Sequence, residues 1–135
     1  MLITETKVRV RYAETDQMGY VYYGRYADYY EVGRTEMIRG LGITYRKFEE
    51  LGIMMPVLEM KIRYYNPARY DDLLTIKTRV EELPIARIHF FCEIYNEQGD
   101  KLNSGEVSLV FTDSETRRPV RAPEELISAM QSHFE

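Results

Sequence analysis

The chain has 135 residues, and its 18 Lys and Arg against 22 Asp and Glu give a formal net charge of −4. This length predicts a single domain over residues 1–135, with enough buried surface for a core without disulfides, and one cysteine cannot form an internal bridge. The acidic balance argues against broad binding to nucleic acid, and no run approaches the roughly 18–20 apolar residues of a membrane span.

The N-terminal segment alternates charged and apolar residues. It has neither the apolar stretch nor the small-residue cleavage site of a secretory signal. We therefore expect a cytoplasmic protein with no membrane and no nucleic-acid partner.

Strict alternation over residues 5–12 predicts a first strand, with Val8, Val10 and Tyr12 on its apolar face. Residues 13–19 break this alternation with Thr, Asp and Gly. We interpret them as a loop that leads into a helix.

Apolar residues then recur at helical spacing over residues 23–40, which predicts a long helix. The apolar stripe consists of Tyr26, Tyr30, Gly33, Met37 and Leu41. Gly33 costs about 1 kcal/mol relative to Ala inside a helix unless close packing compensates. We therefore expect this helix to approach another backbone tightly at Gly33.

A short second helix is expected over residues 44–52, and a last helix after Pro123, with Pro123 at its first position. Between them lie four alternating patterns that predict strands, at 57–65, 73–81, 86–95 and 102–112.

The order β–α–β–β–β–β predicts an α+β fold in which a long central helix is wrapped by a curved antiparallel sheet of about five strands. Such a sheet has exposed edges, and pairing between copies is a common way to cover them. We therefore expect a homo-oligomer.

The loop before the long helix combines a carboxylate, Asp16, with the backbone N–H groups near Tyr23 and Gly24 at the expected helix N-terminus. A helix N-terminus carries partial positive charge and free amide donors, so it can polarise a carbonyl and stabilise an oxyanion. A carboxylate across that carbonyl can attack it or activate water. An aspartate at such a place is, however, more often part of an Asx turn or a cap.

Other reactive side chains are weaker candidates for catalysis than Asp16. Cys92 falls on the apolar face of 86–95 and is interpreted as a buried small hydrophobe, whereas His89 falls on the opposite face and is interpreted as structural. The chain has no zinc-type spacing, nucleophile elbow or phosphate-binding loop. We expect no metal and no cofactor, and a chemistry based on carboxylates and backbone dipoles.

The run RYAETDQMGYVYYGRYADYYEVGRTEM, residues 11–37, resembles the opening motif of hotdog-fold acyl-CoA thioesterases of the 4-hydroxybenzoyl-CoA thioesterase type. Residues 62–74 and 108–123 are similar to later segments of the same family, in the same order. The resemblance implies a hotdog fold and hydrolysis of acyl thioesters.

The resemblance also implies roles for single residues. Asp16 matches the catalytic aspartate, proposed as nucleophile or as general base, and the N–H of Tyr23 matches the donor to the thioester carbonyl. Gly19 matches a turn glycine where backbone and substrate come close. At Tyr23 one branch of the family often has His, and at Arg25 another has Asn, so this chain matches neither branch there.

Three further residues are candidates for substrate binding. Gly24 belongs to the expected amide donors, Tyr26 can line an acyl pocket, and Arg63 can contact the phosphates of CoA or be a solvated strand residue. The spacing of Glu31 and Arg34 on the helix predicts an ion pair between them.

We therefore expect an acyl-CoA thioesterase that releases the free acid and CoA, acts without a cofactor and assembles as a dimer or homotetramer. One alternative is an acyl-carrier-protein thioesterase on the same fold. Another is a non-catalytic acyl-CoA binding protein.

Overall fold

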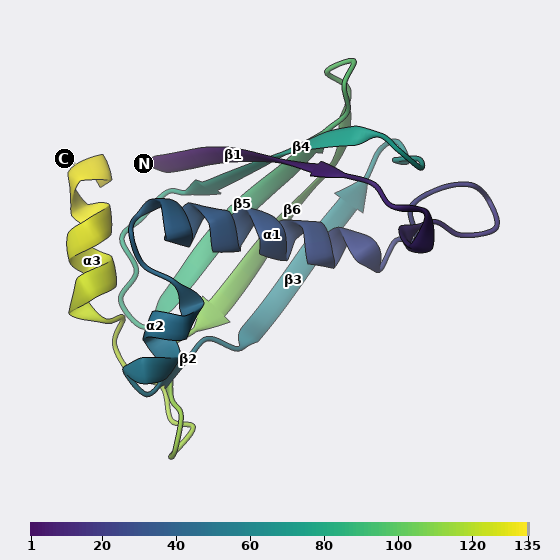
Figure 1. Cartoon of the computed structure of the whole chain (residues 1–135). Coiled ribbons are helices and arrows are strands. Elements are labelled where there is room, and N and C mark those ends of the chain that lie inside the picture. The colour runs from purple at the N-terminus through teal and green to yellow at the C-terminus, as the bar shows by residue number, and fades with distance from the viewer. Residues whose placement is uncertain (135) are drawn as a thin grey trace.

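The computed structural model describes residues 1–134, and its elements follow the predicted order with two short strands added (Figure 1). The strands are β1 (Leu2–Arg9), β2 (Ile53–Met54), β3 (Val57–Tyr64), β4 (Leu73–Val80), β5 (Arg87–Tyr95), β6 (Lys101–Val110) and β7 (Thr112–Asp113). The helices are α1 (Arg25–Gly40), α2 (Tyr45–Glu50) and α3 (Glu124–Gln131), with 3₁₀ turns η1 (Tyr12–Glu14) and η2 (Ser132–Phe134). Within residues 1–134 no helix is long and apolar enough to cross a bilayer.

Five strands form one antiparallel sheet in the order β1-β4-β5-β6-β3, while β2 and β7 pair separately. α1 lies across one face of this sheet, and α3 lies beside the N-terminal end of β1 (Figure 1). The amino group of Met1 donates a hydrogen bond of 2.9 Å to the carbonyl oxygen of His133. The predicted α+β arrangement of a helix on a sheet of five strands is confirmed.

Some element boundaries differ from the prediction. α1 has 16 residues and is shorter than the long helix expected over 23–40, because Tyr23 and Gly24 precede its first turn. Pro123 is the N-cap of α3 rather than its first helical residue. The strands β2 and β7 have two residues each, which is too short for an alternation to reveal.

The alternation in the two strands β4 and β5 predicts their buried faces correctly. Eight inward-facing side chains are at most 1% exposed: Leu74, Ile76, Thr78 and Val80 on β4, and Ile88, Phe90, Cys92 and Ile94 on β5. Both strands have a neighbour on each side and α1 above them, so each inward position is enclosed.

α1 packs most tightly on the sheet at Gly33. A Cβ atom at this position would lie 2.5 Å from Oγ1 of Thr78 and 2.8 Å from Cγ2 of Ile76. The close approach predicted at Gly33 is therefore present, but it is to side chains of β4 and not to another backbone.

The edges of the sheet are less well covered than their alternation suggests. Tyr12 is 77% exposed, contrary to prediction, because β1 ends at Arg9 and Tyr12 begins η1. On β3, Leu58 and Tyr64 are 52% and 48% exposed although they belong to the predicted apolar face. Since β3 is an edge strand, no other strand within residues 1–134 pairs with its outer edge.

We expect Gly33→Ala to lower the free energy of unfolding by about 1–3 kcal/mol, because the added methyl group overfills the contact with β4. Gly40→Ala is the matched control on the same helix, since no atom lies within 4 Å of its added Cβ. That change should be neutral or stabilise by up to about 1 kcal/mol. Urea unfolding of both variants measures this, and equal stability would contradict the tight contact.

Candidate active site

The loop between β1 and α1 folds into a small hairpin. Thr15 and Val21 form an antiparallel bridge, and the N–H of Asp16 donates to the carbonyl of Tyr20 at 2.8 Å. Gly19 has φ of +80°, a left-handed conformation that favours glycine. The hairpin therefore turns tightly directly after Asp16.

The side chain of Asp16 stabilises this turn with one of its two oxygens. Oδ1 accepts hydrogen bonds from the N–H of Met18 at 2.9 Å and from the N–H of Tyr20 at 3.3 Å. This is an Asx turn, the structural role considered for Asp16 above. Oδ2 accepts no hydrogen bond from the described residues and is free to act on a ligand.

The N-terminus of α1 leaves two amide donors unused. Arg25 and Tyr26 donate their N–H groups to the carbonyls of Tyr22 and Tyr23. The N–H groups of Tyr23 and Gly24 have no backbone or side-chain acceptor within the described part of the chain. These are the amides that the sequence predicts as donors to a carbonyl.

Asp16 and Tyr23 line the same cavity, which has a volume of about 300 Å³. Half of the residues in its wall are tyrosines, namely Tyr20, Tyr23, Tyr26, Tyr64 and Tyr65. The sequence predicts Tyr26 here, but it does not single out Tyr64, the last residue of β3, or Tyr65, which follows it. The cavity therefore combines an apolar wall with a carboxylate and a helix N-terminus.

Two tyrosines of the wall are held by their hydroxyl groups. The hydroxyl of Tyr26 accepts a hydrogen bond of 3.1 Å from the N–H of Ala68, and burial raises the pKa of Tyr26. The hydroxyl of Tyr64 lies 3.4 Å from the carbonyl oxygen of Tyr23. These contacts connect the start of α1 to β3 and to the segment that follows it.

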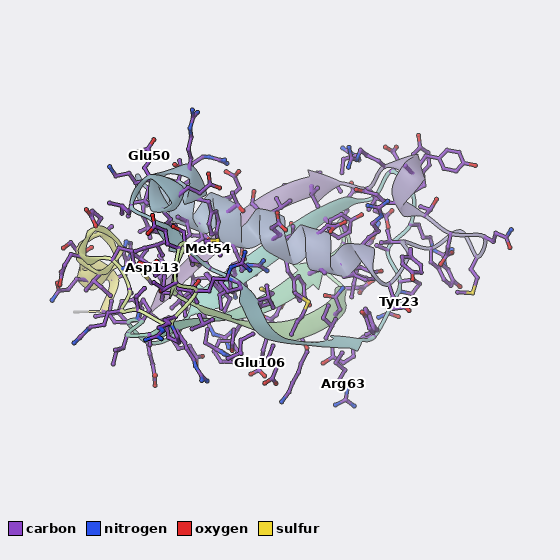
Figure 2. The ribbon with its side chains drawn as sticks, turned by 90° about the horizontal axis from the view of Figure 1, so that it is seen from below. Tyr23, Glu50, Met54, Arg63, Glu106 and Asp113 are labelled. Carbon is purple, nitrogen blue, oxygen red and sulfur yellow. The ribbon has the colours of Figure 1, made fainter. Side chains whose placement is uncertain are left out.

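Arg63 does not join this cavity. It points away from α1, to the outer face of the sheet (Figure 2), and lines a cavity of about 420 Å³ together with Lys61, Arg79 and Lys101. Carboxylates already neutralise part of this charge, since Lys101 Nζ lies 2.7 Å from Glu93. The smaller cavity is the candidate active site, because its lining includes both Asp16, which has a free carboxylate oxygen, and Tyr23, which has a free amide.

The predicted ion pair between Glu31 and Arg34 is absent from the described residues. Arg34 is only 5% exposed and its Nε and Nη1 atoms have no partner there, whereas Glu31 is exposed. The spacing places the two residues near each other on α1, but the side chain of Arg34 is buried whereas that of Glu31 is exposed.

His89 lies on the outer face of the sheet, as predicted. Its Nδ1 atom is 2.6 Å from Oγ of Ser108, and its Nε2 atom is 3.6 Å from Oε1 of Glu106. Among residues 1–134 no three His, Cys, Asp or Glu side chains converge as metal ligands.

Three comparisons relate the chain to known proteins. The sequence profile of the Thioesterase-like superfamily matches residues 10–130. The acyl-CoA thioester hydrolase YbgC of Escherichia coli O6:H1 is 33% identical over 121 residues, which cover 90% of this chain and 90% of that protein. The acyl-CoA thioesterase YbgC of Haemophilus influenzae is 34% identical over 123 residues, with the same coverage of both.

A solved structure agrees with the sequence relatives. The DHNA-CoA thioesterase of Staphylococcus aureus is 31% identical and superposes with a TM-score of 0.89, covering 100% of this chain and 97% of its own. The similarity therefore extends over the whole fold, including the Asp16 hairpin and α1.

Cys92 should be chemically inert in the folded chain. Burial raises the pKa of its thiol to about 12, and the side chain is 1% exposed. At mildly alkaline pH the thiol is therefore protonated and enclosed, whereas the reactive form is the thiolate. We expect a chromogenic disulfide reagent to label the guanidinium-unfolded chain completely while leaving the folded chain unlabelled. Rapid labelling of the folded chain would refute this.

Proposed function

The chain belongs to the Thioesterase-like superfamily and has a hotdog fold, and we propose that it hydrolyses an acyl-CoA thioester to the free carboxylic acid and CoA. The observation that carries the proposal is that Asp16 and Tyr23, whose amide is unused, line one cavity, with the unused amide of Gly24 next in the chain. We further propose one thioesterase domain over 1–135 and, since a free thiol is typical of a reducing compartment, a cytoplasmic location.

The thioester carbonyl oxygen binds at the N-terminus of α1, with the N–H of Tyr23 as its donor and that of Gly24 beside it. These amides stabilise the negative charge that develops on the oxygen when the carbonyl is attacked; losing one such donor typically lowers kcat about 10²–10³-fold. The free Oδ2 of Asp16 either attacks the carbonyl carbon, giving an acyl-enzyme anhydride that water opens, or removes a proton from an attacking water. In both routes CoA leaves as its thiolate.

The remaining predicted residues position the two ends of the substrate. Gly19 and Gly24 carry no side chain, so backbone can approach the ester closely, and Tyr26 packs against the acyl group. Arg63 binds phosphates of CoA. The hydroxyl of Tyr65 is 2.9 Å from Oγ of Ser104, which lines the cavity of Arg63, so a CoA chain lying over Tyr65 passes from one cavity towards the other.

We expect Asp16→Asn to lower kcat for thioester hydrolysis by about 10²–10⁴-fold, the usual range for losing a general base. Asn retains the oxygen that accepts the hydrogen bonds of the Asx turn, so the melting temperature should change little. Thiol release from a panel of short, long, hydroxylated and aromatic CoA esters measures this, with an acyl-carrier-protein ester included for the alternative substrate.

Asp113→Asn is the matched control for this experiment. Asp113 also forms an Asx turn, accepting from the N–H groups of Glu115 and Thr116, and it lies at the opposite end of the molecule from Tyr23 (Figure 2). Its replacement should leave turnover unchanged. Full activity of Asp16→Asn, or no thiol release by the unchanged chain, would contradict the proposed chemistry.

We also propose that the chain forms a homo-oligomer through the free edge of β3. The edge strand carries apolar side chains that are about half exposed, with Val57 at 49% and Leu58 at 52%. A second copy paired along β3 would cover them and complete the hydrogen bonding of the strand.

Leu58→Lys should shift the oligomer towards monomer in light scattering, because a charge at the centre of an interface is costly to bury. Ile3→Lys is the control on the other edge strand, where Ile3 is 47% exposed on β1, and it should leave the mass unchanged. A monomeric parent chain would contradict the proposal, and so would an unaltered mass for Leu58→Lys.

A further inference from the structure

One buried contact ties the Asp16 hairpin to α1. The hydroxyl of Tyr29 donates a hydrogen bond of 2.9 Å to Oε1 of Glu14, across 15 residues of sequence. Tyr29 is 1% exposed and Glu14 is 6% exposed, so water does not compete for this contact. Neither side chain lines the cavity of Asp16.

Glu14 is held in place from its other side by Arg11. Oε1 also accepts from the N–H of Arg11 at 2.8 Å, and Oε2 lies 3.1 Å from Nη2 of the same residue. Burial acts to raise the pKa of Glu14, but the hydrogen bonds from Arg11 and Tyr29 outweigh it and hold the pKa below its ordinary value. The carboxylate is therefore ionised and fixed at neutral pH.

The backbone of Glu14 is connected to the helix N-terminus as well. Its carbonyl accepts the N–H of Tyr22 at 2.9 Å, one residue before Tyr23. Glu14 thus contacts the start of α1 through Tyr22 and the second turn of α1 through Tyr29. These two contacts join Glu14, which precedes the hairpin of Asp16, to Tyr22, which follows the hairpin, and to α1.

We propose that Glu14 and Tyr29 are positioning residues that fix the separation between the Asp16 carboxylate and the Tyr23 amide. The inference rests on the proposed function, because only hydrolysis makes that separation matter. Asp16 lies in the hairpin and Tyr23 lies directly before α1, and the hydrogen bond from Tyr29 to Glu14 joins the start of the hairpin to the helix. A displacement of the order of 1 Å between reacting groups can lower a rate about 10²-fold.

If Glu14 and Tyr29 only stabilised the fold, their replacement would have a different effect on turnover. Another residue of α1 serves as the control. Tyr30, the next residue, is equally buried and donates its hydroxyl to Oδ1 of Asn103 on β6 at 2.6 Å. Replacing Tyr30 by Phe removes one buried hydrogen bond, as replacing Tyr29 does, but leaves the hairpin untouched. The two variants separate lost stability from lost positioning.

The test compares Tyr29→Phe with Tyr30→Phe in steady-state thioester hydrolysis and in amide hydrogen exchange of residues 14–24. We expect Tyr29→Phe to lower kcat about tenfold with KM within about twofold, and to speed exchange of the hairpin amides. Tyr30→Phe should keep kcat and the hairpin exchange rates, whatever its melting temperature. Glu14→Gln, which retains an acceptor for Tyr29, should keep more of kcat than Glu14→Ala.

The outcomes that overturn the inference differ from those that overturn the proposed function. Unchanged kcat and unchanged hairpin exchange in Tyr29→Phe, or equal losses of kcat in both tyrosine variants, would overturn the positioning role while Asp16→Asn remains inactive. Absence of turnover in the parent chain would overturn the function. Hydrogen exchange would still report in that case whether Glu14 and Tyr29 hold the hairpin.

Discussion

The packing of α1 against one face of the sheet is the constraint on which the rest of the structure depends. At Gly33 the helix backbone comes so close to β4 that no side chain fits between them. This contact fixes the axis of α1, and buried tyrosines before Gly33 and aliphatic side chains after it fill the remaining space. With the axis fixed, the N-terminus of α1 lies next to the end of β3 and the segment after it, where Tyr26 binds Ala68. The cavity arises at that meeting point, so the packing of the core determines which residues line it.

The sequence predicted the elements well wherever a strand is enclosed on both sides. Alternation along β4 and β5 identified their buried side chains, because each strand has two neighbours and a helix above it. Alternation says nothing of which strand lies at an edge. Leu58 and Tyr64 are apolar in sequence and half exposed in space for that reason. The pattern specifies which face a side chain occupies, whereas its burial depends on neighbours that are distant in sequence.

The residues of the site divide in the same way, into those that a local pattern reveals and those that only the fold brings together. Asp16, Tyr23 and Gly24 lie within nine residues, so a local motif could reveal them, and Gly19 follows from the turn they need. Tyr64 and Tyr65 arrive from β3, about 40 residues later, and only the fold brings them to the cavity. Alternation assigns Arg63 to the face opposite Ile62 and Tyr64, which is the outer face of the sheet in the structure.

Glu14 was missed for another reason. Its short-range contacts to Arg11 resemble those of an ordinary capping box, and its burial depends on Tyr29, whose position relative to the loop only the fold determines. For Asp16 the structure confirms the Asx turn, and this turn is compatible with the proposed catalytic role. One oxygen of its carboxylate binds the amides of the turn and thereby fixes the side chain, which leaves the other oxygen in a defined place beside the helix N-terminus. An aspartate held by its own turn loses little conformational entropy when a substrate binds, so in the proposed mechanism the Asx turn would preorganise the carboxylate.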